Sequence, residues 1–387
     1  MPFPVVWTVS TETMTDRNRN RLDTEMMAIA VRMARRGLGT TAPNPSVGAV
    51  IVDETTGEII GRGWTQPGGR PHAEKEALRR AGPRARGKTM YVTLEPCAHT
   101  GRVPTCADAL VAVGIRRLVC AIPDPNPIVS GRGFAQLRAA GIEVDVGYLA
   151  DEARWVTLGH ILRQTEERPF VQLKMALDAT GRVAAGDGSP VWVTGPEARA
   201  YAHLLRARAD AILVGAGTVL ADDPALTCRL PGLAARSPDR IVLDTRLRTP
   251  PTAKVYRQGV TKPRVWVAAA LDVMDEGAAH GDAMLLDAGS TDGASLDIEG
   301  LLATLARNGL TRLLVEGGPT VWYAFLAAGL VDEVCLVQGP NEAEGSTIPV
   351  ITGDRDAYFA RYKLLPVLSR QRSLGTDRLH VYRRESP

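Results

Sequence analysis

The sequence predicts an α/β protein of two domains. Strand-like and helix-like patterns alternate along the chain, which is typical of α/β folds. The 387 residues are more than a single domain of about 150 residues needs. The alternation is interrupted once, where Arg168 and Pro169 follow a helical stretch and a new strand pattern begins.

The composition is that of an ordinary globular protein, with 45% hydrophobic and 23% charged residues. The formal net charge of +3 does not favour nucleic acid or a membrane surface as a partner, and a modest basic excess suits a phosphorylated small substrate. No run of about 18 apolar residues predicts a membrane span. Five cysteines without a disulfide framework favour thiols or metal ligands in a reducing cytoplasm.

Residues 1–20 are expected to form a disordered extension. They lack a basic segment followed by an apolar one, so they do not match a signal peptide. Met14 is an alternative start of the chain.

The first half begins with a helix expected at Thr24–Arg36, capped by Asp23 or Thr24. Two prolines predict a loop at Thr41–Gly48. Beyond it, apolar segments alternate with segments of helical periodicity. We expect strands at Ala49–Val52, Met90–Leu94 and Arg117–Ala121, helices at His72–Ala81 and Thr105–Val113, and a further α/β unit at Phe134–Val146.

A connecting helix is expected at Asp151–Glu167, so the sequence predicts domains at 21–147 and 148–387. The stretch Gly277–Asp297, rich in Gly, Ala and Asp, is predicted to be a surface loop. The second alternating series has expected strands at Phe170–Met175, Ala211–Val214, Arg240–Asp244, Arg264–Ala268, Arg312–Val315 and Glu333–Val337, and expected helices at Pro196–Ala209, Ile298–Asn308 and Thr320–Ala328.

One histidine and two cysteines have the pattern of a catalytic zinc site. His72 opens a predicted helix, Cys97 follows a strand, and Cys106 lies in the first turn of the next helix. Zinc favours tetrahedral nitrogen and sulfur ligands, and three protein ligands leave a position for water. Glu74, two residues after His72, would carry protons, as in the H-x-E and P-C motifs of zinc deaminases. Here eight residues separate the cysteines, a longer spacing than in that motif.

Two alternatives stay open for these residues. His72 could be a solvated residue at a helix start, with the cysteines as small buried hydrophobic residues. His99 could be a fourth ligand, which would close the site and make it structural. A substrate contact is the other interpretation of His99.

The second half has no G-x-G-x-x-G fingerprint after a strand, so no Rossmann site is predicted. Instead, Gly215 and Gly217 follow a strand, and Asp222 and Arg229 are expected in the short loop after them. Further on, Val315-Glu-Gly-Gly-Pro-Thr320 ends a strand and begins a helix. A glycine-rich helix start suits a cofactor pyrophosphate.

These motifs together resemble one family, the bifunctional deaminase/reductases of riboflavin biosynthesis. The resemblance covers nearly the whole chain from about Asp23. In the first half the matching stretches are Thr41-Ala-Pro-Asn-Pro-Ser-Val-Gly48, Pro71-His-Ala-Glu74, Leu94-Glu-Pro-Cys-Ala-His-Thr-Gly-Arg-Val-Pro-Thr-Cys106, Asp124-Pro-Asn-Pro127 and Gly131-Arg-Gly133. In the second half they are Trp192-Val-Thr194, the run from Gly215 to Arg229, and the Glu-Gly-Gly motif at Glu316.

The resemblance implies a cytidine-deaminase-like N-terminal domain and a dihydrofolate-reductase-like C-terminal domain, with Zn²⁺ and NADPH as cofactors. In the deaminase it implies substrate contacts at Asn44 and Arg102. In the reductase it implies that NADPH is lined by Leu177, Trp192, Thr218, Asp222, Thr245, Gly318, Pro319 and Thr320. It implies reductase substrate contacts at Ser189, Arg206, Leu226, Arg229 and Glu316, and also at Lys174, which would be catalytic. The guanidinium forks of Arg206 and Arg229 suit a phosphate.

The implied function is two successive steps of riboflavin biosynthesis. The first domain would deaminate 2,5-diamino-6-ribosylamino-4(3H)-pyrimidinone 5′-phosphate with a zinc-bound hydroxide, and Glu74 would pass the proton to the ring nitrogen and then to ammonia. The second would reduce the ring-opened ribosyl group to ribityl with hydride from NADPH.

Two other functions would share some of these features. A nucleic-acid-editing deaminase would need a basic face with aromatic stacking residues, and only 5% of the residues are aromatic. A zinc-stabilised binding protein without catalysis would not need Glu74. We therefore expect a small phosphorylated pyrimidine as substrate and no nucleic-acid or membrane partner. A homo-oligomer is compatible with the sequence.

The sequence departs from the pattern of the family in two places, at Thr65 and at the pair Asp178 and Thr180. Thr65 stands where relatives often have a histidine, and we assign it no role. Relatives usually follow the lysine and three further residues with Ser-Leu-Asp-Gly, whereas here Asp178 holds the Ser position and Thr180 the Asp position. If the strand continues to Thr180, both side chains face one side and could present the same groups to one pocket. The alternative is a turn that tolerates either order.

Overall fold

The computed structural model describes residues 16–98, 104–127, 129–184, 193–257, 263–270, 283–287, 297–342 and 347–385. It divides into two compact units. The first contains residues up to Arg36, then Val47–Thr65 and Pro71–Trp155, and the second contains Gly37–Ser46, Gln66–Arg70 and Val156–Pro387. In the described part of the chain, no helix combines the length and apolar character needed to cross a membrane.

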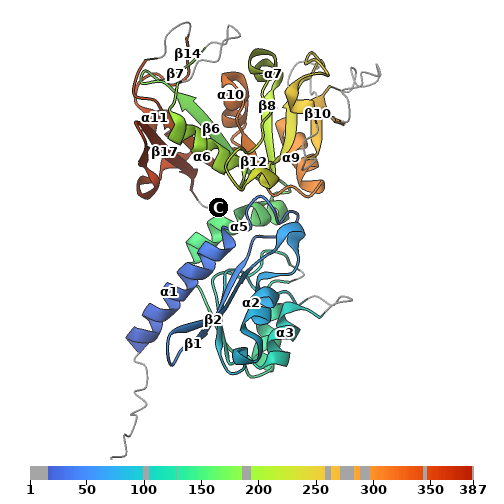
Figure 1. Ribbon diagram of the computed structural model, residues 1–387, viewed down its shortest axis with the longest axis vertical. Helices are drawn as coiled ribbons and strands as arrows, with labels where there is room; N and C mark the ends of the chain where they lie inside the picture. Colours follow the sequence, from blue (N-terminus) through green and yellow to red (C-terminus); the bar gives the residue numbers. More distant parts are fainter. Residues whose placement is uncertain are drawn as a thin grey trace, which may run out of the picture. The chain divides into compact units, whose positions relative to one another are not determined.

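The first unit is built on a five-stranded mixed sheet of order β2-β1-β3-β4-β5 (Figure 1). The pairs β1·β2 and β1·β3 are antiparallel, and β3·β4 and β4·β5 are parallel. The strands are β1 (Gly48–Asp53), β2 (Glu58–Trp64), β3 (Thr89–Val92), β4 (Arg117–Cys120) and β5 (Glu143–Val146). The helices are α1 (Asp16–Ala34), α2 (Ala73–Ala81), α3 (Cys106–Val113) and α4 (Arg132–Ala139).

Glycines set how closely the helices approach this sheet. A Cβ on Gly48 would lie 2.0 Å from the carbonyl oxygen of Ala30 in α1, and one on Gly63 would lie 2.4 Å from that of Ala73 in α2. Gly63 pairs with Ala49, the neighbour of Gly48. Successive residues of a strand face opposite sides, so α1 and α2 cover opposite faces of the sheet. This close packing fixes the first turn of α2, directly after His72.

The second unit is built on a larger sheet of order β11-β10-β9-β8-β12-β6-β13-β17-β15, with β16 paired to β17. The strands from β11 to β13 in this order are parallel, and β17 and its partners are antiparallel. The strands are β6 (Phe170–Leu177), β8 (Ala211–Gly215), β9 (Asp239–Leu243), β10 (Val265–Ala269), β11 (Met284–Asp287), β12 (Arg312–Val315), β13 (Glu333–Gln338), β15 (Leu364–Pro366), β16 (Arg372–Leu374) and β17 (Asp377–Arg384).

Helices cover both faces of this sheet. One core cluster joins Leu173 and Leu213 to residues of α9 and α10, and the other joins Ile212 and Leu314 to residues of α6. The helices are α5 (Ala150–Thr165), which spans the division between the units, α6 (Pro196–Arg206), α7 (Ala216–Asp222), α9 (Ile298–Arg307), α10 (Pro319–Ala327) and α11 (Arg355–Ala360). A small pair, β7 (Arg182–Ala184) and β14 (Thr347–Pro349), is antiparallel.

Several expectations from the sequence need correction. Helix α1 begins at Asp16, so the expected disordered extension is wrong for residues 16–20; residues 1–15 lie outside the described part. The segment after Gly215 is not a short loop, because α7 occupies Ala216–Asp222. The predicted surface loop Gly277–Asp297 contains β11, which pairs in parallel with β10.

The exchange of Asp178 and Thr180 has a local explanation. Strand β6 ends at Leu177, so the strand does not continue to Thr180 as the shared-pocket hypothesis requires. Asp178 is fully buried, and its Oδ1 accepts hydrogen bonds from the Thr180 amide, the Thr180 hydroxyl and the Arg182 amide at 2.8, 2.8 and 3.0 Å. The two exchanged side chains therefore bond to each other within a turn.

A buried arginine ties the first unit together. The guanidinium of Arg117 on β4 is bound by the carboxylates of Asp23 on α1, Glu54 after β1 and Asp145 on β5, at 2.8, 2.7 and 2.5 Å. Burial raises the pKa of Asp23, but hydrogen bonds from Arg117 and Tyr91 outweigh this, so its pKa is lowered overall. One cation thus holds three elements against a central strand.

We expect Arg117→Met to lower the free energy of unfolding of the first unit by about 3–5 kcal/mol, because it leaves buried carboxylates without a counter-charge. Urea titration with hydrogen exchange in β4 measures this. Arg84→Met is the matched control: its ion pair with Glu58 is exposed, so stability should barely change. Since the pKa of Asp23 is lowered in the folded state, its stabilisation is present above the ordinary value of 3.8 and is lost as the pH falls through the lower folded value. Equal losses in the two variants would contradict this account.

Candidate active sites

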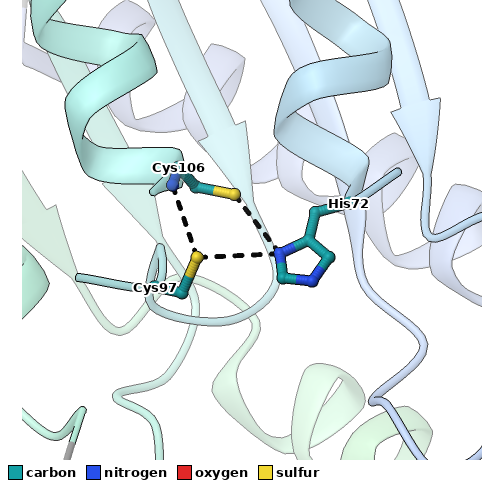
Figure 2. A group of neighbouring side chains, drawn as sticks. All are labelled: His72, Cys97 and Cys106. Carbon is teal, nitrogen blue, oxygen red and sulfur yellow. Dashed lines mark hydrogen bonds between the residues drawn. The ribbon is translucent and has the colours of Figure 1, made fainter. Parts of the chain in front are cut away.

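Three potential metal ligands converge in the first unit, as Figure 2 shows. His72 is the N-cap residue of α2, Cys97 lies beyond the end of β3, and Cys106 is the first residue of α3. The Nδ1 atom of His72 is 3.7 Å from the sulfur of Cys97 and 3.4 Å from that of Cys106. All three ligand atoms lie within 4.8 Å of one another. The structure therefore brings together the ligand set predicted from the sequence.

The spacing of these atoms fits zinc. With Zn–S bonds of about 2.3 Å and Zn–N bonds of about 2.0 Å, a tetrahedral ion holds nitrogen and sulfur ligands about 3.5 Å apart. The two nitrogen–sulfur distances lie on either side of this value. Three protein ligands leave one position for water, which is the arrangement of catalytic sites. His99 lies outside the described residues.

The thiols of the cluster influence each other strongly. The backbone N–H of Cys106 donates to the sulfur of Cys97 at 3.3 Å. Hydrogen bonds from Cys106 and His72 lower the pKa of Cys97 to about 4, and the bond to Cys97, with burial, raises the pKa of Cys106. Zinc binds thiolates, so any proton that the pair retains must be displaced when the metal binds.

Glu74 is the second residue of α2 and is 3% exposed. Burial raises the pKa of its carboxyl group, while the charge of His72 opposes this and that of Cys97 adds to it. A carboxyl group with a raised pKa can hold and release a proton closer to neutral pH, as a general acid–base group must.

Two further residues, Asn44 and Arg102, were predicted to contact the substrate of the deaminase. Asn44 belongs to the segment Gly37–Ser46, which is part of the second unit, and its amide lies against Gly69. Arg102 lies outside the described residues. Thr65 is buried, and its hydroxyl accepts a hydrogen bond from the Val47 amide at 3.0 Å. This bond joins the residue before β1 to the residue after β2, so Thr65 stabilises the pairing of these two strands.

In the second unit, Lys174, Arg206 and Glu316 interact on one face of the large sheet. Glu316 follows β12, and its carboxylate forms two parallel hydrogen bonds of 2.8 Å with the guanidinium of Arg206 on α6. Burial would raise the pKa of Glu316, but the charges and hydrogen bonds of Arg206, together with Lys174, lower it overall. Burial lowers the pKa of Lys174, and Glu316 only partly opposes this.

The guanidinium of Arg206 is thus largely engaged in contacts within the protein. Its third nitrogen donates to the carbonyl oxygen of Thr227 at 3.2 Å. Arg229, by contrast, is exposed, and its amide donates to Nδ1 of His203 at 3.3 Å. Of the two arginines, Arg229 has the guanidinium that is available to a substrate phosphate.

His203 is a residue that the sequence analysis missed. Its Nδ1 also lies 3.1 Å from the Thr227 carbonyl oxygen. His203 therefore contacts the Leu226–Arg229 loop at two residues, Thr227 and Arg229. In this loop Leu226 has a positive φ of 53°. Burial and the nearby charges of Arg206 and Arg229 lower the pKa of His203. Its position three residues before Arg206 on α6 places both on one helix face, a signal that could have identified it.

Two helix N-termini meet where NADPH is expected. Gly215 is the N-cap residue of α7 and Gly318 that of α10, and neither start has a side-chain cap. A Cβ on Gly215 would lie 2.8 Å from Val321, and one on Gly318 would lie 3.7 Å from the Thr218 hydroxyl, so the two helix starts are neighbours. Uncapped backbone N–H groups favour anions, and the geometry fits a cofactor pyrophosphate.

The remaining predicted cofactor residues lie at or next to the ends of elements, where the structure describes them. Pro319 is the first residue of α10 and Thr320 the second. Leu177 ends β6 and is buried, Thr245 follows β9, and burial raises the pKa of Asp222 at the end of α7. Ser189 and Trp192 lie outside the described residues.

Comparison with known proteins identifies both halves. Residues 20–122 match the family model "Cytidine and deoxycytidylate deaminase zinc-binding region", and residues 169–355 match "RibD C-terminal domain". The riboflavin biosynthesis protein RibD of Escherichia coli (strain K12) is 40% identical over 357 residues, which are 88% of this chain and 95% of that protein. RibD of Aquifex aeolicus is 38% identical over 94% of this chain and 99% of its own length.

Solved structures give the same result. Acinetobacter baumannii RibD (form 1) matches with a TM-score of 0.79 and 36% identity, over 95% of this chain and all of that one. A deaminase/reductase from Thermotoga maritima, described as a diaminohydroxyphosphoribosylaminopyrimidine deaminase and 5-amino-6-(5-phosphoribosylamino)uracil reductase, matches with a TM-score of 0.81 and 32% identity over the same shares. These matches confirm the fold class and the pair of cofactors, Zn²⁺ and NADPH, predicted from the sequence. The chain belongs to the RibD family, the bifunctional deaminase/reductases of riboflavin biosynthesis.

Proposed function

We propose that His72, Cys97 and Cys106 hold the zinc of the deaminase and that Glu74 carries its protons. The observation that supports this most strongly is the spacing of the three ligand atoms, which suits a tetrahedral ion with one open position. The proposed substrate is the diaminopyrimidinone ribosylamino 5′-phosphate named for the family, with Asn44 and Arg102 as contacts.

Deamination needs a nucleophilic water and a proton carrier. Bound zinc supplies the Lewis acidity that makes water nucleophilic near neutral pH. Glu74 takes a proton from the attacking water and delivers it to the ring nitrogen. It then takes the second proton, from the hydroxyl added to the ring carbon, and passes it to the amino group, which leaves as ammonia while the carbonyl forms. Its raised pKa supports this shuttle, because the group must be both a base and an acid in one cycle.

The reductase adds a hydride to C1′ of the ribosylamino group and a proton to the ring oxygen, as the C1′–O bond of the sugar ring breaks; the ribosyl group becomes ribityl and keeps its bond to nitrogen. NADPH supplies the hydride. We assign the proton to Lys174, whose lowered pKa eases its release to the developing alkoxide. Glu316, held by Arg206, keeps a negative charge beside Lys174, and Arg229 binds the phosphate. NADPH lies along the starts of α7 and α10, in contact with the residues named for it above.

We assign both reactions to the cytoplasm, where thiols stay reduced. All five cysteines are free, and two of them must be thiolates to bind zinc. Oxidation would remove both ligands together.

The ligand assignment predicts about one zinc per purified chain. Cys106→Ser should lose both zinc and deaminase activity, because the hydroxyl is a poor ligand for this ion, while reductase activity on the deaminated substrate persists. Elemental analysis and ammonia release measure the two effects. Full zinc content in Cys106→Ser, with loss in His99→Ala, would show a different ligand set.

Glu74→Gln should slow deamination by about 10²–10⁴-fold, since an amide cannot shuttle protons, with zinc content unchanged. The control is Glu76→Gln, the same substitution one half-turn along α2, where the carboxylate is bound by Arg79 and Arg80 and activity should persist. Most of the deaminase activity surviving in Glu74→Gln would remove this residue from the mechanism.

The two arginines should have separable effects on the reductase. Arg229→Ala should raise the KM for the phosphorylated substrate by about 10–100-fold, the worth of charge-assisted hydrogen bonds, with little change in kcat. Arg206→Ala should lower kcat as well, because it leaves Glu316 without its partner. NADPH oxidation with the deaminated substrate measures both, with Arg264→Ala, an exposed pair with Asp239, as the control. An unchanged KM in Arg229→Ala would place the phosphate elsewhere.

A further inference from the structure

Glu95 is a buried carboxylate two residues before Cys97, and it is 3% exposed. Its Oε1 accepts hydrogen bonds from the amides of Gly133 and Phe134 at 2.9 and 3.4 Å. Its Oε2 accepts from those of Gly131 and Asp124 at 3.0 and 3.3 Å. Among the described residues it forms no ion pair, so backbone N–H groups alone compensate its charge.

Three of the four amides that bind Glu95 come from two motifs to which no role has been given, Asp124-Pro-Asn-Pro127 and Gly131-Arg-Gly133, and the fourth is that of the next residue, Phe134. Gly131 has a φ of +75°, a left-handed conformation that favours glycine. A Cβ on Gly133 would lie 2.3 Å from the carbonyl oxygen of Pro96, so this position has no room for a side chain. Both glycines therefore serve one close contact with the residues that precede Cys97.

Cys97 is held from the opposite side by α3. Its carbonyl oxygen accepts from the Ala107 amide at 3.2 Å, and its sulfur accepts from the Cys106 amide at 3.3 Å. The Glu95 amide donates to the carbonyl oxygen of Ile122 at 3.1 Å. The backbone from Glu95 to Cys97 is thus fixed between a helix start and the loop after β4.

We propose that Glu95 is a positioning residue of the deaminase: by binding the amides of residues 124–134 it fixes the backbone that presents Cys97 to zinc. The inference rests on the proposed role of Cys97 as a zinc ligand. A carboxylate can accept all four N–H groups. An amide cannot, because its NH₂ would face two of these donors, and buried donors left unsatisfied are costly.

Glu95→Gln is therefore expected to weaken the binding of zinc, although Glu95 is not itself a zinc ligand. Residues that orient metal ligands typically contribute 10–100-fold to metal affinity or activity. We expect zinc to be lost to a chelator about 10–100-fold faster, deaminase kcat to fall, and the visible spectrum of the Co²⁺-substituted protein to change. Turnover of the deaminated substrate by the reductase should stay at the wild-type level.

Glu54→Gln is the matched control. Glu54 has a largely buried carboxylate bound to Arg117, and it follows β1, whose Val52 pairs with Thr89 at the start of β3, the end far from Cys97. This variant should lose stability but keep wild-type zinc release. Gly133→Ala is a second test, since its Cβ would press on Pro96 and on the side chain of Glu95, and it should also speed zinc loss.

The outcomes separate this inference from the proposed function. Wild-type zinc release and kcat in Glu95→Gln would overturn the inference, and so would equal zinc loss in Glu54→Gln, because general destabilisation would then explain the effect. If Glu95→Gln does not fold, Gly133→Ala decides, and wild-type zinc release there overturns the inference. Full zinc content in Cys97→Ser would overturn the ligand assignment itself.

Discussion

Both candidate centres depend on one constraint, the meeting of helix starts with the ends of neighbouring strands. In the first unit, His72 and Cys106 lie at the starts of α2 and α3, and Cys97 follows β3. In the second, α7 begins after β8 and α10 begins after β12, and these two helix starts are where the cofactor is expected. Helix starts present free N–H groups, which favour thiolates in one case and a pyrophosphate in the other.

Charge in the two centres is controlled by different means. Around the zinc ligands, burial is the main cause that raises the pKa of Glu74, and the hydrogen bond to Cys97 is the main cause that raises the pKa of Cys106. Around Lys174, burial lowers the pKa of the lysine, while Arg206 outweighs burial and keeps the pKa of Glu316 below its ordinary value.

The sequence predicted the elements that carry the zinc ligands, but it missed two of the longer strands, β2 and β17. The zinc ligands were recognisable because each sits at a predicted helix start or strand end, and the structure brings them together. The small strands β7 and β14 were missed, because three residues pairing across a long separation leave no periodicity. The role of Arg206 could not be foreseen either. Its bidentate partner Glu316 is 110 residues away along the chain, and only the folded sheet shows that its guanidinium is occupied.

The composition of the two compact units has a consequence for dissecting the gene. Segments Gly37–Ser46 and Gln66–Arg70 interrupt the first unit in sequence yet belong to the second, and α5 contributes residues to both. A cut within or after α5 leaves both segments on the upstream fragment, apart from the unit with which they cluster. Monofunctional versions are therefore better made by point mutation in the full-length chain than by truncation.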